Sequence, residues 1–94
     1  MILKELQGKE LLEAKEKELR RALKQYRIDV GLSSPFQVSK ELGMGKDTVY
    51  KYEKGTSIPT LSKLNMLIMF YGLDKIHREY LLSLREEIIK MRRG

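Results

Sequence analysis

The sequence contains no cysteine and only one histidine, and these shortages exclude several kinds of site. Without cysteine there is no disulfide bond and no thiolate metal site, which fits a reducing cytoplasm. His77 has no second cluster of candidate ligands near it, and no pairing of a nucleophile with a base is visible in the sequence. We therefore expect no enzyme activity, no metal site and no cofactor.

Long apolar runs are also missing. No stretch approaches the roughly 20 apolar residues that a transmembrane helix needs, and no signal-peptide pattern is present. The expectation is a soluble cytoplasmic protein without membrane contact. With 94 residues the chain has the size of one domain, in which burial of apolar surface alone gives only marginal stability.

Positive charge, in contrast, is abundant. Nineteen Lys and Arg outnumber thirteen Asp and Glu, which gives a net charge of +6. This balance favours a polyanionic partner, although solubility alone makes many small helical proteins basic. Residues 33–55 hold four basic and three acidic residues, so their total charge is nearly zero. A nucleic-acid site in this segment therefore requires its lysines to lie on one face.

Residues 35–54, PFQVSKELGMGKDTVYKYEK, have the spacing of two short helices joined by a tight turn. Gly43 falls where the first helix must end, in a left-handed conformation that favours glycine. Small Ser39 falls where two steeply crossing helices leave little room. Val49 and Tyr52 give the second helix an apolar inner face. The pattern predicts a helix-turn-helix, and the alternative is an unrelated helical hairpin.

With its flanks, this segment resembles the lambda-repressor-like DNA-binding domains, the Cro and phage-repressor (XRE) family. The resemblance runs from about Leu19 to Leu73, a little over half of the chain. The similar segments are RIDVGL at 27–32, GMGKDTV at 43–49, and YEKG at 52–55 followed by IPTLSKL. This resemblance implies an all-α domain that binds double-stranded DNA through the second helix of the motif.

Helical patterns cover five segments, at residues 9–29, 35–42, 45–54, 60–71 and 75–91. Thr60 and Asp74 can cap the last two helices. The first helix is longer than its counterpart in the family. We therefore expect an N-terminal helical extension at residues 1–18 and a helix-turn-helix domain with a C-terminal dimerisation helix at residues 19–94. The extension is either a solvated helix or a contact surface for another chain.

Two further expectations depend on the resemblance. In several phage repressors, Arg and Glu at the positions matching Arg27 and Glu53 form an inward salt bridge between the first and third helices, so both are expected to be structural. Pro35 departs from the family, since many members carry a glutamine there that grips backbone phosphate. Proline cannot make this contact, so Gln37 or Ser34 is expected to take it over.

The recognition helix supplies the other DNA candidates. Lys46, Asp47 and Tyr50 are predicted to read base edges, with Lys46 donating to guanine and Tyr50 meeting a thymine methyl or a phosphate. Asp47 either accepts from cytosine or only favours the helix N-terminus. Short or cationic donors are expected at phosphates, which position the protein without reading sequence. They are Ser34, Gln37, Thr48, Lys51, Lys54, Thr56 and Ser57.

A dimer is expected because one helix-turn-helix contacts only one half-site. The fifth helix carries apolar residues at spacings of three, four and three, and these form a predicted dimer interface. They are Leu81, Leu84, Ile88 and Met91. Met66, Met69 and Phe70 on the fourth helix add apolar surface. The alternative is that both sets pack on the long first helix within one monomer.

The sequence therefore predicts a sequence-specific DNA-binding transcriptional regulator. We expect a repressor that occupies a two-fold operator as a dimer and excludes polymerase. The alternative is an antitoxin-type protein-interaction module that binds a toxin, with DNA binding secondary. A second protein that co-purifies at fixed stoichiometry would favour this alternative.

Overall fold

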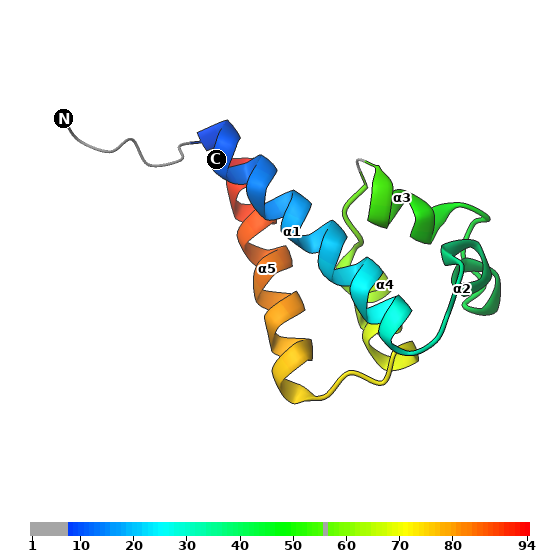
Figure 1. Cartoon of the computed structure of the whole chain (residues 1–94). Coiled ribbons are helices and arrows are strands. Elements are labelled where there is room, and N and C mark those ends of the chain that lie inside the picture. Colours follow the sequence, from blue (N-terminus) through cyan, green and yellow to red (C-terminus); the bar gives the residue numbers. More distant parts are fainter. Residues whose placement is uncertain (1–7, 56) are drawn as a thin grey trace.

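A computed structural model of the chain describes residues 8–55 and 57–94 and consists of five helices (Figure 1). They are α1 (Gly8–Asp29), α2 (Pro35–Glu41), α3 (Thr48–Lys54), α4 (Leu61–Phe70) and α5 (Lys75–Arg93). The predicted all-α, five-helix fold is confirmed. Residues 1–7 of the predicted extension lie outside the described residues, as does Thr56, a predicted phosphate contact.

The two long helices, α1 and α5, lie side by side and antiparallel (Figure 1). Glu16 near the start of α1 accepts a hydrogen bond from Arg92 near the end of α5 at 2.8 Å. Leu12, one turn earlier, packs against the core. Helix α1 also runs without a break across the predicted boundary between residues 18 and 19. The described part of the extension is therefore docked on α5.

One apolar core joins all five helices. Helix α1 supplies two large apolar side chains, α2 one, and the other helices all the rest except Tyr71, which is the C-cap residue of α4. Its members are Leu19, Leu23, Val38, Val49, Tyr52, Leu64, Leu67, Ile68, Tyr71, Leu81, Leu84 and Ile88. Because α2 and α3 bury side chains in the same core as α1 and α5, the motif is held on a rigid support.

The structure corrects the predicted dimer interface on α5. Leu81, Leu84 and Ile88 are 0%, 3% and 0% exposed within the single chain, so they are core residues. Met91, the fourth residue of the set, is half-buried. Apolar residues repeat every three and four positions both on the core-facing side of a helix and at an interface between two chains. The spacing alone therefore could not distinguish a dimer interface from the core. Met69 on α4 is different, because it is 81% exposed.

Both predicted capping residues begin their helices as expected. The Thr60 hydroxyl accepts a hydrogen bond from the backbone N–H of Lys63 at 3.2 Å. The Asp74 carboxylate accepts one from the backbone N–H of His77 at 3.0 Å. These contacts satisfy amides that the first turn of a helix leaves without a partner.

Candidate nucleic-acid interface

Helices α2 and α3 and the turn between them form the predicted helix-turn-helix. Gly43 has a φ of +69°, the left-handed conformation that the sequence predicts there. Helix α3 begins at Thr48 rather than at the predicted Gly45. The reason is a tight turn in which the Thr48 N–H donates to the Gly45 carbonyl at 3.0 Å. The turn sets the angle between the two helices.

Ser39 holds α2 and α3 together by more than its small size. The residue is 0% exposed, and its Oγ accepts a hydrogen bond from the backbone N–H of Val49 at 2.9 Å. That amide lies in the first turn of α3, where the helix supplies no acceptor of its own. The sequence predicted only a small residue at this position. The only sequence feature that indicated this hydrogen bond was that the small residue is a serine and not an alanine.

The ion pair that the resemblance implies is present in the structure. The Arg27 Nε and Nη2 groups donate to the two Glu53 carboxylate oxygens at 2.8 and 2.9 Å, and Nη1 donates to the Leu32 carbonyl at 2.8 Å. Both side chains are buried. The hydrogen bond to the carboxylate raises the pKa of Arg27 above its usual value. The pair joins α1 to α3 and keeps the Glu53 charge away from the outer face of α3.

All three predicted base-reading residues are exposed at the start of α3. Lys46 and Asp47 lie in the turn before the helix, and Tyr50 lies in its first turn. Asp47 is the N-cap residue of α3, but its side chain makes no capping hydrogen bond. Instead its Oδ2 lies 3.9 Å from the Lys51 Nζ. This exposed pair is weak, and it partly offsets the carboxylate charge beside the lysines.

The predicted phosphate contacts differ in how accessible their side chains are. Lys51 and Lys54 are exposed on α3. The Ser34 hydroxyl accepts the capping hydrogen bond of α2 at 3.2 Å, and the Gln37 amide donates to Glu41 at 3.0 Å. The two other described candidates, Thr48 and Ser57, are half-buried. The two lysines and Gln37 are therefore the exposed donors of this group, and Gln37 already donates to Glu41.

An aromatic pair on this surface was missed by the sequence analysis. The rings of Phe36 and Tyr50 stack with their centroids 5.1 Å apart and an angle of 18° between their planes. Both residues remain exposed, at 44% and 39%. The pairing joins α2 to α3 across the turn, so no local periodicity reveals it. The only sequence feature that indicated the pair was Phe36, an apolar residue outside the inner stripe of α2.

A groove of about 780 Å³ lies beside this pair. It is lined by Phe36, Gln37, Lys40, Met44 and Lys46. Two apolar side chains and two lysines thus share one surface. This combination suits the major groove of DNA, where thymine methyl groups lie near the phosphate backbone.

The described residues hold no candidate metal site. Within residues 8–55 and 57–94, no three His, Cys, Asp or Glu side chains gather around a possible metal position. His77 instead lies with its Nδ1 2.7 Å from the Asp74 carboxylate at the start of α5. None of the helices described has the length and apolar character to cross a membrane.

Comparison with known proteins agrees with this geometry. A family model described as a helix-turn-helix domain matches residues 18–81, which include α2, α3 and α4 and parts of α1 and α5. No curated protein and no solved structure matches the chain. Helix-turn-helix domains are typically DNA-binding and not enzymes. Because the match covers more than half of the chain and contains the motif, this protein belongs to the helix-turn-helix domain family, in the lambda-repressor-like form that its sequence resembles.

Proposed function

We propose that this protein binds double-stranded DNA with sequence specificity and represses transcription. The observation that carries the proposal is the division of α3 into two faces. Val49 and Tyr52 are buried in the core, whereas Tyr50, Lys51 and Lys54 are exposed. A short helix that presents lysines and an aromatic ring outward from a rigid support is suited to the major groove.

Lys46 and Tyr50 read the bases in this proposal. Lys46 donates to guanine O6 and N7, and the Tyr50 ring contacts a thymine methyl group. Stacking on Phe36 restricts the positions of the Tyr50 ring, so less conformational freedom is lost on binding. Lys51 and Lys54 contact phosphates and position α3 without reading sequence.

The repressor acts as a dimer, and α4 offers the surface for the second copy. Leu42, Met66, Met69 and Phe70 line an apolar groove of about 340 Å³, and Met69 is 81% exposed. Exposed apolar surface of this kind marks interaction sites. Since the α5 stripe is core, this patch takes over the role that the sequence analysis gave to α5. Two half-sites about one DNA turn apart would then bind one dimer.

Selection of bound fragments from random duplex DNA tests the proposal and supplies the operator. Lys46→Ala should weaken operator binding by about 1–3 kcal/mol and relax the preference at one base position. Lys51→Ala should instead weaken operator and scrambled duplexes alike and lower the salt slope by about one. If no sequence is enriched, sequence-specific binding is wrong. If Lys46→Ala weakens both duplexes equally, Lys46 does not read bases.

The apolar patch on α4 also supports the second candidate function, an antitoxin-type module. In that case Leu42, Met66, Met69 and Phe70 contact a different protein rather than a second copy. Purification at native expression levels separates the two functions. A second protein at fixed stoichiometry, lost in a Met69→Glu variant, would identify the module, whereas a homodimer would support the repressor.

A further inference from the structure

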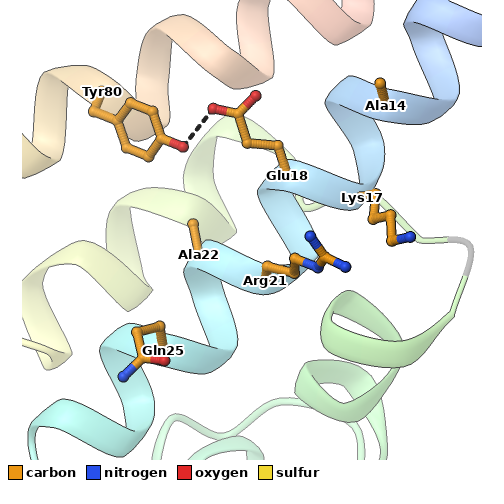
Figure 2. A pocket seen from close by; sticks show the side chains of 7 residues that line it. All are labelled: Ala14, Lys17, Glu18, Arg21, Ala22, Gln25 and Tyr80. Atoms are coloured by element: carbon orange, nitrogen blue, oxygen red, sulfur yellow. Dashed lines mark hydrogen bonds between the residues drawn. The ribbon is translucent and has the colours of Figure 1, made fainter.

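One side of α1 contacts α5 through charged side chains. Three of its charged side chains, Lys15, Glu16 and Glu18, contact α5 residues at 3.0, 2.8 and 2.6 Å. Tyr80 is the partner of Glu18, and Figure 2 shows its hydroxyl directed at the Glu18 carboxylate. Both acidic residues that α1 has between positions 15 and 20 are therefore used to dock the two long helices.

A different side of α1 carries four cations. Lys17, Arg20, Arg21 and Lys24 are spaced by three, one and three residues, so they form one helical stripe. In Figure 2, the Lys17 and Arg21 side chains leave α1 on the side opposite the Tyr80 ring, although both residues also line an open pocket of about 550 Å³ with Tyr80. None of the four forms an ion pair with a carboxylate in the described part of the chain. Like charges at this spacing repel one another, so the stripe gains stability from an anionic partner.

The stripe and the end of α3 line one groove of about 230 Å³. From α3 the groove includes Lys54 and Glu53. The Glu53 carboxylate is bonded to Arg27, so its charge is already compensated. Five cations therefore line the groove, and the charge of its one acidic residue, Glu53, is compensated by Arg27.

This groove is continuous with the proposed DNA surface, because Lys54 is the last residue of α3. From Lys17 to Lys24 the stripe extends about 10 Å along α1, the length of about three base pairs along a duplex. Duplex DNA carries phosphates at this density, whereas a protein partner would need a matching row of carboxylates. A row of free cations beside the recognition helix thus fits a phosphate backbone.

We infer that the groove formed by the Lys17–Lys24 stripe and the end of α3 binds the DNA phosphate backbone that flanks the major groove contacted by α3. The inference rests on the proposed DNA binding and assigns a role to the exposed cationic side of α1. Because α1 is packed against α5, the helix that carries these cations has the same position in the free protein. Such contacts add affinity and salt dependence but no sequence preference.

The test compares two double variants of the full chain on the selected operator with about ten flanking base pairs on each side. Lys17→Gln with Arg21→Gln removes two exposed cations of the groove. Its slope of log affinity against log salt should fall by about 1.8, since each phosphate contact contributes about 0.9. The matched control is Lys75→Gln with Arg78→Gln, which removes two exposed cations from the start of α5. The control should keep the wild-type slope.

A trimmed operator without its flanks gives a second readout. Wild type on the trimmed duplex should behave like the groove variant on the long duplex, and trimming should not affect the groove variant further. Circular dichroism checks folding, and Lys24→Gln replaces the double variant if that variant unfolds. An unchanged slope in the groove variant overturns the inference, as does an equal loss in the control. Loss of a co-purifying acidic protein with an unchanged slope would assign the groove to that protein instead.

These outcomes also separate the inference from the proposal on which it rests. If wild type binds neither operator nor scrambled duplex, DNA binding itself is wrong. If Lys46→Ala loses operator preference while the groove variant matches wild type, only the role of the groove is wrong.

Discussion

At the scale of single residues, the Arg27–Glu53 pair connects stability with the site. Two charges taken out of water are tolerated because each finds its partner at hydrogen-bond distance, with the Leu32 carbonyl as a further acceptor. Removing one partner leaves the other charge buried and alone. The same pair holds the C-terminal half of α3 against α1, so it also orients the proposed recognition helix.

Glu53→Ala should therefore lower the free energy of unfolding by about 3–5 kcal/mol. Asp47→Ala is the matched control, because it removes a carboxylate of the same region whose pair with Lys51 is exposed. That change should cost only about 0–1 kcal/mol. Urea unfolding followed by circular dichroism measures both. A Glu53→Ala midpoint equal to that of Asp47→Ala would mean that the buried pair contributes little.

The stacked pair of Phe36 and Tyr50 makes a second prediction at this scale. If the pair contacts a thymine methyl group, replacing that thymine by deoxyuridine should weaken wild-type binding by about 0.8 kcal/mol, about fourfold, the value of one buried methyl or methylene group. The Phe36→Ala variant should bind both duplexes equally, because the Tyr50 ring loses its support. Tyr50→Phe keeps the ring and should still discriminate. Equal discrimination by Phe36→Ala and wild type would exclude Phe36 from the contact.

At the scale of helices, the antiparallel contact of α1 and α5 decides how the long first helix is used. It joins exposed polar contacts to buried apolar ones, since Leu19 and Leu23 of α1 and Leu81 and Ile88 of α5 belong to the same core. The exposed pairs contribute little individually. Burial of the leucine and isoleucine side chains, at about 1.5–3 kcal/mol each, is the larger effect. Helix α1 is therefore held mainly by its apolar stripe, and the cations from Lys17 to Lys24 form no ion pair among the described residues.

The hydrogen bond between Tyr80 and Glu18 makes this contact sensitive to alkaline pH. Burial first, and then the hydrogen bond to Glu18, raise the pKa of Tyr80 to about 12. In the unfolded chain tyrosine loses its proton near pH 10. The unfolded state thus binds fewer protons above that pH, so this stabilisation is complete below about pH 10 and declines as the pH rises toward 12.

Unfolding by urea at several pH values above about 9 measures this effect. The wild-type midpoint should fall with rising pH, and the fall should be smaller in Tyr80→Phe, which has no proton to lose at this position. Burial also raises the pKa values of Tyr26, Tyr52 and Tyr71, so part of the fall should remain in the variant. Identical pH profiles for the two proteins would contradict a role for Tyr80.

At the scale of the whole molecule, one core serves both the fold and the motif, so the apolar stripe of α5 is not available for assembly. The α5 stripe is consumed by the core, and the α4 patch around Met69 remains exposed. Stability and dimerisation should therefore depend on different residues. This separation can be tested with two substitutions of the same kind.

Ile88→Glu should unfold the protein, because it places a charge at a position that is 0% exposed. Met69→Glu should leave the free energy of unfolding of the monomer within about 0.5 kcal/mol of wild type, as exposed substitutions usually do. In sedimentation, Met69→Glu should halve the mass seen for wild type and weaken operator binding. A wild type that sediments as a monomer at operator-binding concentrations would rule out the dimer, and a folded Ile88→Glu monomer would return the interface to α5.

The sequence by itself determined the motif and most of the helix ends, although α3 begins three residues later than predicted. Spacing, capping residues and the glycine at Gly43 act within a few neighbouring residues, so they can be recognised without knowing what packs where. The Arg27–Glu53 pair required the resemblance, because its partners are 26 residues apart. Lys46, Asp47 and Tyr50 were placed on the exposed surface by the same local periodicity.

Only the tertiary structure decided which apolar stripe is covered by which helix. Ile88 lies in the core and Met69 at the surface although both belong to apolar helical repeats, because periodicity identifies a face and not its neighbour. The Phe36–Tyr50 stack and the Ser39 hydrogen bond likewise depend on the crossing of α2 and α3. The groove between α1 and α3 forms where the folded chain brings the Lys17–Lys24 stripe beside the end of α3. Contacts between distant segments are set by the packing of the whole chain, which no local pattern contains.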